Sequence, residues 1–298
     1  MAGLLRLLRA VVCALPERWV RRLGRWLGRL AFSVLRIRRR VAVGNLRAAL
    51  GLRAPEARRL AARVYAHLGT GTLELLRVSR LDEEQAASLL GPRGLAQLRL
   101  LLSEGRGLLV LSAHLGHWDL LACASARSGI PVAVVTRSIK QGALNRFWME
   151  DREACGVRLL PAAGSAREIL KALRRGSAVA MLIDQHEPGG EVVSFFGRPA
   201  STSTALARLA RATRVPVVPV FLVRRGDGFV LDVGEPVPLR WTQDRRGDLH
   251  RATQQLTTVV EEAIARCPEQ WLWLHRRWKL GKDVGAPGRR VVKSPTAS

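Results

Sequence analysis

The residues best suited to chemistry stand directly after a short apolar run. Residues 107–112 read GLLVLS, and the segment that follows places His114, His117 and Asp119 at the start of a helical pattern. An imidazole has a pKa of about 6.5, so it can accept a proton at neutral pH, and a carboxylate on its second nitrogen fixes the tautomer. Asp119 lies about one helical turn beyond His114, which predicts a general base, His114, oriented by Asp119. The spacing alone leaves open a capping histidine and a solvated carboxylate.

Other polar side chains follow further apolar runs of the chain. Residues 131–136 and 178–183 are two such runs, and a Ser-Phe-Phe-Gly-Arg-Pro segment comes after the second. Because ligands bind at the carboxyl ends of parallel strands, we expect these side chains on the same rim as His114. A base, carboxylates, cations and an apolar patch suit an anionic substrate with an apolar portion. The candidate substrate-binding residues are Arg137, Asn145, Arg152, Asp184, Gln185, Phe195, Phe196 and Gly197.

The elements that would position these residues alternate between strand and helix. Short apolar runs typical of buried strands occupy 107–112, 131–136, 178–183 and 215–223. Helical patterns separate or follow them at 118–127, 144–155, 165–174 and 203–214. This alternation predicts an α/β fold with a mostly parallel central sheet flanked by helices. We also expect helices within 40–80 and 82–103, short strands at 229–233 and 237–239, and a closing helix at 249–266.

The first 40 residues form an amphipathic and strongly basic segment. They contain eleven arginines and one acid, Glu17, and Trp and Leu recur opposite the arginines at helical spacing. This pattern is typical of a helix lying in a membrane interface, although a surface helix and a short or tilted spanning helix remain open. The predicted division is a membrane-associating segment at 1–40, an α/β domain at 41–280 and a disordered basic tail at 281–298.

Composition limits the partners of the chain. It has 49 Lys+Arg against 24 Asp+Glu, a net charge of +25, which favours nucleic acid, an anionic membrane or a phosphorylated substrate. Aromatic residues amount to 5% without the pattern of a stacking platform, which argues against nucleic acid. A noncatalytic protein that binds anionic membranes or nucleic acid is the alternative. No Cys-x-x-Cys pair or Cys/His metal spacing occurs, so we expect reduced, buried cysteines, no metal and a cytosol-facing location.

Several blocks of the sequence together resemble one family. His114-x4-Asp119 is similar to the signature of the glycerolipid and lipid A acyltransferases, and the remaining blocks resemble the lauroyl/myristoyl acyltransferases of lipid A biosynthesis. In chain order these blocks are RRVAVGN at 39–45, TR at 136–137, Asn145, Arg152-x3-Gly156, DQ at 184–185, FFG at 195–197, VPVVP at 215–219 and EQWLWLHRRWK at 269–279. Blocks in this order are more specific than the His-x4-Asp motif alone.

The resemblance implies transfer of a fatty acyl group from a thioester donor to a hydroxyl of a lipid acceptor, with no metal, cofactor or acyl-enzyme. In the close relatives the donor is acyl carrier protein and the acceptor a phosphorylated glucosamine disaccharide lipid, at the cytoplasmic face of the bacterial inner membrane; a coenzyme A donor stays open. The implied roles are proton abstraction by His114, orientation by Asp119, phosphate binding or oxyanion stabilisation by Arg137 and Arg152, and substrate holding by Asp184 and Gln185.

The core motif leaves the acceptor open. Other members of the wider superfamily acylate phosphatidylinositol mannosides or glycerophosphate. The segment after the third apolar run lacks the Phe-Pro-Glu-Gly block of the glycerophosphate enzymes, which disfavours that acceptor.

Overall fold

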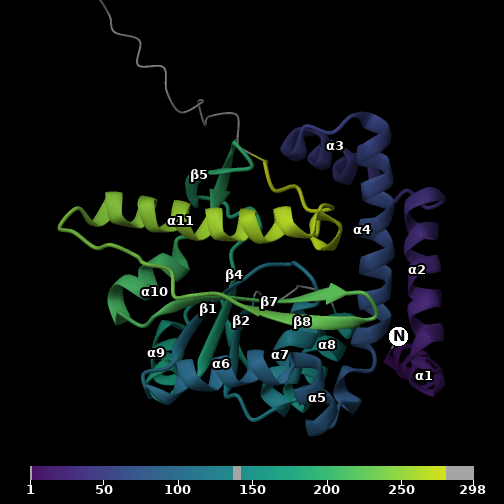
Figure 1. Cartoon of the computed structure of the whole chain (residues 1–298), viewed down its shortest axis with the longest axis horizontal. Helices are drawn as coiled ribbons and strands as arrows, with labels where there is room; N and C mark the ends of the chain where they lie inside the picture. Colours follow the sequence, from purple (N-terminus) through teal and green to yellow (C-terminus); the bar gives the residue numbers. More distant parts are fainter. Residues whose placement is uncertain (1, 137–141, 280–298) are drawn as a thin grey trace, which may run out of the picture.

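A central sheet of six strands organises the chain. The computed structural model describes residues 2–136 and 142–279. In sheet order the strands are β3 (Arg158–Pro161), β2 (Val132–Thr136), β4 (Ala178–Leu182), β1 (Leu108–Ser112), β7 (Val217–Arg225) and β8 (Gly228–Val233). Neighbouring strands are parallel except β7 and β8, which form an antiparallel hairpin. The predicted α/β fold with a mostly parallel sheet is confirmed (Figure 1).

Both faces of the sheet are covered, because successive apolar residues of each buried strand point to opposite sides. In β1, Leu108 and Val110 belong to one core, and Leu109 and Leu111 to the other. The first core is shared with α5 (Glu83–Leu90), α6 (Pro92–Ser103) and α7 (Trp118–Arg127). The second is shared with α9 (Ala166–Arg174), α10 (Ala205–Thr213) and α11 (Arg245–Arg266). In Figure 1, α11 lies above the sheet, and α6 and α7 lie below it.

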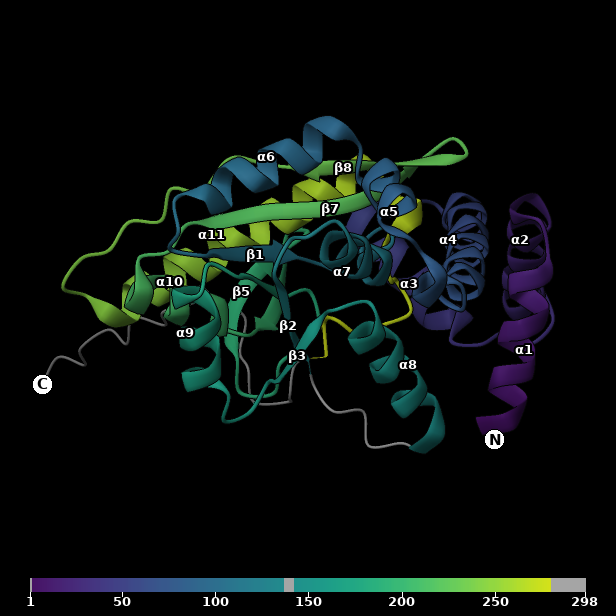
Figure 2. The same ribbon diagram turned by 90° about the horizontal axis from the view of Figure 1, so that it is seen from below.

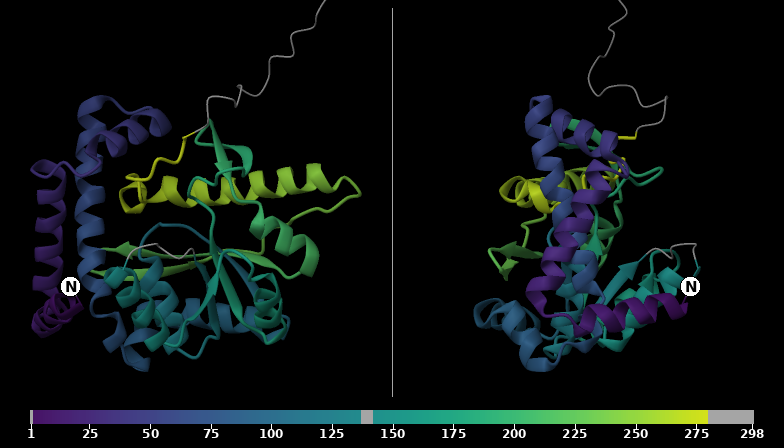
Figure 3. Two further views of the ribbon diagram at one scale, coloured as in Figure 1. Left: turned by 180° about the vertical axis from the view of Figure 1, so that it is seen from behind. Right: turned by 90° about the vertical axis from the view of Figure 1, so that its right-hand side faces the viewer.

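Four helices precede the sheet domain and form its outer edge. They are α1 (Ala2–Ala14), α2 (Glu17–Ser33), α3 (Arg39–Leu50) and α4 (Ala54–Leu75). Helix α2 runs along the outer side of α4 (Figures 2 and 3). Glycines permit this close approach: a Cβ atom on Gly28 would lie 2.0 Å from the carbonyl oxygen of Tyr65, and one on Gly24 would lie 2.5 Å from the Cα of Thr70. The two helix backbones are therefore in direct contact.

The outward side of this helical edge carries large apolar side chains. Trp19 and Trp26 of α2 expose 49% and 58% of their surface. Within residues 2–136 and 142–279, no helix has the length and apolar character needed to cross a bilayer. Helix α1 reaches α8 (Gly142–Ala154), where Arg9 forms an ion pair with Asp151 and lies 4.0 Å from the ring centre of Phe147.

Some elements differ from those expected. Strand β3 and the hairpin of β5 (Glu191–Phe195) and β6 (Arg198–Thr202) were not predicted. The expected strand at 237–239 is wrong. The N–H of Val237 donates to the carbonyl of Val217 at 2.8 Å, but the prolines on both sides of Val237 lack the donors that a longer ladder needs, and the N–H of Leu239 turns back to the carbonyl of Val237 at 2.9 Å. All four cysteines are free, as expected; Cys123, Cys155 and Cys267 are buried as expected, whereas Cys13 is only partly buried.

Candidate active site

The register of two neighbouring strands brings His114 and Asp184 together. Strands β1 and β4 pair in parallel with Ser112 opposite Leu182. His114 and Asp184 each stand two residues beyond that pair, at the carboxyl ends of the strands. Parallel pairing in register therefore places the imidazole directly beside this carboxylate.

The Asp184 carboxylate is held by three donors. It accepts the backbone N–H of His114 at 2.8 Å and the indole N–H of Trp271 at 2.7 Å on Oδ2, and Nδ1 of the His114 ring lies 2.9 Å from Oδ1. An ionised carboxylate only accepts hydrogen bonds, so Nδ1 carries the proton and donates. The lone pair of the neutral ring therefore sits on Nε2, and the side-chain nitrogen of Gln185 donates to it at 3.1 Å.

The pair shifts the acidity of both partners. Burial raises the pKa of Asp184 by itself, but the charge and hydrogen bonds of His114 and the hydrogen bond of Trp271 outweigh burial and lower the pKa to about 2. Burial disfavours the imidazolium of His114, yet the Asp184 carboxylate overcomes it and raises the pKa of His114. A histidine of raised basicity beside an anion suits proton abstraction.

Asp119 takes a different partner from the one expected. Arg152 of α8 donates through Nε to Oδ1 of Asp119 at 2.8 Å, and a second bond runs from its Nη2. Asp119 lies in the first turn of α7 and its carboxylate meets the guanidinium from α8, whereas Nδ1 of His114 meets Asp184. The contact expected between Asp119 and Nδ1 is thus made by Asp184, although the charge of Asp119 also raises the pKa of His114.

An apolar cavity of about 660 Å³ opens beside these residues. Its polar end includes His114, Asp119, Arg152 and Gln185. The edge of the Trp118 ring packs against His114, with 5.1 Å between ring centres. The apolar wall is made mainly of strand, α6 and α7 side chains, among them Leu98, Val110, Leu121, Ala122, Ile130, Val134 and Val220. The cavity volume falls in the range of about 300–1,000 Å³ that is common for small-ligand sites.

The other candidate residues lie apart from this cavity. Phe195, Phe196 and Gly197 belong to the β5–β6 hairpin: Phe195 is fully buried 5.6 Å from Trp271, and the other two form the turn. Asn145 lies on α8 and is not among the cavity-lining residues. Arg137 lies outside the described residues, as does the tail 281–298.

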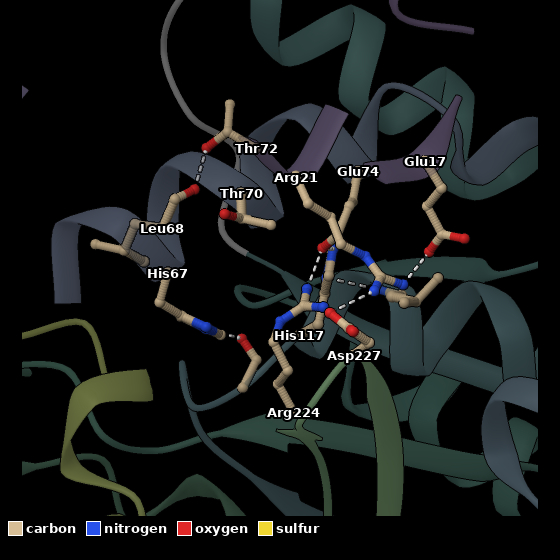
Figure 4. A network of polar contacts seen from close by, with 12 residues as sticks. Glu17, Arg21, His67, Leu68, Thr70, Thr72, Glu74, His117, Arg224 and Asp227 are labelled. Atoms are coloured by element: carbon tan, nitrogen blue, oxygen red, sulfur yellow. Dashed lines mark hydrogen bonds and ion pairs between the residues drawn. The ribbon is translucent and has the colours of Figure 1, made fainter. Parts of the chain in front are cut away.

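His117 belongs to a buried ionic network behind the site (Figure 4). Its Nδ1 accepts the N–H of Leu120 at the start of α7, and its Nε2 lies 3.8 Å from Glu74 of α4. Glu74 pairs with Arg224 of β7 and lies 3.6 Å from Arg21 of α2. Burial lowers the pKa of His117 to about 3, so the ring stays neutral and caps α7 rather than acting as a base.

Sequence reasoning missed Trp271 as part of the site. It lies in the C-terminal block at 269–279 that resembles the family, but no local signal links it to Asp184, which is 87 residues away. A buried indole needs a partner for its N–H, and that is the only general clue. No group of three or more metal-ligating side chains occurs among residues 2–136 and 142–279.

An apolar cavity of this size with the His114–Asp184 pair beside it can accommodate a substrate that has an apolar part. The sequence model of the bacterial lipid A biosynthesis acyltransferases matches residues 3–280. The chain belongs to this family of acyltransferases, as the ordered sequence blocks indicated.

Individual relatives carry different acceptor names. A phosphatidylinositol mannoside acyltransferase of Mycolicibacterium smegmatis is 26% identical over 69% of this chain and 67% of its own length. The lipid A biosynthesis lauroyltransferase of Escherichia coli is 26% identical over 94% of this chain and 91% of its own. The lipid A biosynthesis palmitoleoyltransferase of the same organism is 24% identical over 88% and 85%.

Proposed function

We propose that the protein is a membrane-associated O-acyltransferase that moves a fatty acyl chain from a thioester to a hydroxyl of a lipid A precursor or a related glycolipid. The observation that carries the proposal is the apolar cavity opening beside the His114–Asp184 pair. The cavity suits the acyl chain, and the imidazole suits the hydroxyl. The acyltransferase family of the chain supports the same reaction class.

His114 acts as the general base in this proposal. The acceptor hydroxyl gives its proton to Nε2 while its oxygen attacks the thioester carbonyl carbon. The tetrahedral intermediate then collapses, the carbon–sulfur bond breaks, and the leaving thiolate takes the proton from the imidazolium. Asp184 holds Nδ1–H throughout and stabilises the transient positive charge, because the carboxylate is buried and ionised.

The remaining polar residues at this end of the cavity bind the substrate and stabilise the charge that develops on it. Arg152 brings a positive charge to the cavity wall, where it can stabilise a carbonyl oxyanion or a phosphate, and Asp119 fixes the orientation of its guanidinium. Gln185 donates to the Nε2 lone pair in the resting state and is displaced when the acceptor hydroxyl takes that position. Arg137 keeps its proposed role of phosphate binding from the sequence alone.

The net positive charge of the chain and the exposed side chains of its N-terminal helices support the proposed donor and membrane partners. A net charge of +25 suits an acidic acyl carrier protein as donor and anionic lipid headgroups at the cytoplasmic face of the inner membrane. The exposed Trp19 and Trp26 of α2 support attachment of residues 1–40 to the bilayer, with 41–280 as the catalytic part. The lipid A and mannoside acceptors of the relatives are the two acceptors to compare.

The test is an acyl-transfer assay with the purified full chain. Acyl carrier protein and coenzyme A thioesters are offered with a lipid A precursor or a phosphatidylinositol mannoside, and product is followed by mass spectrometry. Removing the base in His114→Ala should lower the rate by about 10²–10⁴-fold. His250→Ala removes an exposed histidine and is the control. Unchanged transfer by His114→Ala, or no transfer to either acceptor by the wild type, contradicts the proposal.

A further inference from the structure

The turn between α2 and α3 combines exposed apolar and cationic side chains. We call residues 34–38 the α2–α3 turn. Val34, Leu35 and Ile37 expose 66%, 61% and 50% of their surface. The other two residues of the turn are exposed arginines. Three adjacent aliphatic side chains in water form a patch that normally marks an interaction surface.

The two arginines occupy backbone positions that favour glycine. Arg36 has φ 51° and Arg38 has φ 48°, both in the left-handed region. A side chain there is strained, because its Cβ approaches the following carbonyl. Arginine at both positions keeps two charges at places where the backbone alone would favour glycine. In the described residues these two arginines form no ion pair, and the one hydrogen bond that their guanidinium groups make is the long contact of Arg38 with the carbonyl of Leu274 at 3.5 Å.

Hydrogen bonds hold the turn in this shape. The N–H of Leu35 donates to the carbonyl of Leu30 at 3.1 Å, and the N–H of Ile37 donates to that of Ala31 at 3.1 Å. The hydroxyl of Tyr65 on α4 donates to the carbonyl of Ile37. The exposed aliphatic side chains thus belong to an ordered turn fixed to α4, and not to a loose loop.

The positive charge around the turn is uncompensated. Arg39 and Arg40 follow directly, and the sequence has no acidic residue between Glu17 and Glu56. In the described parts of the chain, no ion pair involves any of the four arginines from 36 to 40. A partner that meets this surface must supply both negative charge and an apolar medium.

We propose that the α2–α3 turn inserts into an anionic phospholipid bilayer, with its aliphatic side chains among the acyl chains and its arginines on the lipid phosphates. A membrane interface offers both environments within a few ångströms, and guanidinium groups bind phosphate well. The proposal rests on the membrane association proposed above and assigns the insertion to this turn instead of to the face of α2 alone.

The turn lies close to the segment that supports the active site. Arg38 Nη1 donates to the carbonyl of Leu274 at 3.5 Å, and Asn45 Nδ2 of α3 donates to that of His275 at 2.8 Å. The same segment begins with the tryptophan that holds Asp184. Figure 1 shows α3 beside this C-terminal segment, drawn in yellow. Insertion of the turn would fix the position of the catalytic pair relative to the bilayer surface.

Vesicle binding by the full-length protein tests the proposal. Sedimentation is measured with vesicles of phosphatidylcholine alone and with vesicles in which about one lipid in three is phosphatidylglycerol, which is anionic. The double variant R36G/R38G should bind the anionic vesicles about 20–30-fold more weakly, with little change on neutral vesicles. Leu35→Ser with Ile37→Ser should weaken binding to both by at least about tenfold.

Matched controls separate insertion from general effects. Arg214 is also exposed and left-handed, with φ 59°, but lies at the end of α10, so R214G removes the same charge and strain elsewhere. Leu100→Ser removes a leucine of α6 that is 71% exposed. Both should bind vesicles like the wild type. R36G/R38G should keep a native circular dichroism spectrum, because glycine relieves strain at both positions and the variant loses only the long hydrogen bond of Arg38 to the carbonyl of Leu274.

Two results would overturn the inference. If both double variants of the turn bind like the wild type while Trp26→Ser weakens binding, the lipid contact belongs to α2. If the controls lose as much binding as the turn variants, the effect is not specific to the turn. Acyl transfer to a detergent-dispersed acceptor is measured in parallel, because failure of the proposed reaction would abolish that activity in every form and leave the vesicle comparison unaffected.

Discussion

Replacing Asp184 by asparagine is the sharpest test of how the site is built. The change keeps the shape of the side chain but removes its charge. An amide offers one acceptor oxygen, whereas the carboxylate now accepts from the His114 backbone, the His114 ring and the Trp271 indole. At least one buried donor therefore loses its partner, and Nδ1 no longer faces an anion.

The expected loss follows from those contacts. A hydrogen bond to a charged group contributes about 1.5–3 kcal/mol, which is roughly 10–150-fold in kcat/KM when the bond stabilises the imidazolium that forms in the transition state. The control His250→Ala should stay at the wild-type rate, as should Asp232→Asn, which changes a half-buried acid of β8 that pairs with Arg266. Asp119→Asn should cost less than Asp184→Asn, because Asp119 contacts Arg152 instead of the ring.

The pH profile gives a second and independent signature. In the proposed mechanism neutral His114 is the active form, so kcat/KM should fall as the pH drops through the pKa of His114, which Asp184 raises. In Asp184→Asn the acidic limb of the pH profile should move to lower pH, because the carboxylate that raises the pKa of His114 is gone. The folded-state pKa of Asp184 is about 2 against an ordinary 3.8, so its contribution to stability is present above 3.8 and is lost as the pH falls towards 2. The variant should show less of that acid destabilisation.

The assay is initial-rate acyl transfer from pH 5 to 9, with acid unfolding followed by circular dichroism. Each variant is first checked for a native spectrum at neutral pH. A folded Asp184→Asn protein with the wild-type rate and an unmoved acidic limb would refute the proposed role of this carboxylate beside the His114 ring. A loss with an unmoved limb would indicate a purely structural role.

Three further changes test other parts of the structure. Arg152→Ala leaves Asp119 buried without its cation and should destabilise the fold by about 3 kcal/mol in urea unfolding, whereas the double variant with Asp119→Ala should recover part of that loss. Gly28→Ala should loosen α2, because its Cβ would lie 2.0 Å from a backbone oxygen of α4, and faster proteolysis of residues 2–33 should report it; Gly44→Ala, which meets nothing within 4 Å, should be neutral or stabilising. Ala122→Phe fills the cavity and should lower the rate with a 16-carbon donor roughly tenfold more than with an 8-carbon donor, and equal losses would place the acyl chain elsewhere.

The sequence sufficed for the parts of the fold that depend on local pattern. The apolar runs predicted β1, β2, β4 and β7, and the strand-end rule pointed to His114. The partner of the His114 ring could not be predicted, because strand order is a long-range property. Nothing in the sequence near residue 184 indicates that β4 lies next to β1. Once that order is known, the register alone brings position 184 beside position 114.

The positions of Phe195 and Phe196 could not be predicted for a different reason. Phe195 and Phe196 follow an apolar run and were expected at the rim. An unpredicted hairpin turns them away, and the tryptophans near the C-terminus form an aromatic cluster with Phe195. Short strands with Gly-Arg-Pro at the turn lack the alternation that marks a hairpin. Aromatic residues of this kind are decided by tertiary packing, which a single sequence does not reveal.

The ion pair between Arg9 of α1 and Asp151 of α8 has a practical consequence for work with shortened chains. Asp151 is the neighbour of Arg152 on the helix that borders the cavity, and burial raises the pKa of Asp151 against the opposing influence of Arg9. A chain trimmed to begin at α2 would leave the Asp151 carboxylate without its arginine partner and would remove the contact of α1 with α8. Trimming done to improve solubility would therefore disturb the helix that supplies Arg152 to the cavity wall, and a drop in turnover after such a deletion should not be credited to loss of the proposed lipid attachment alone.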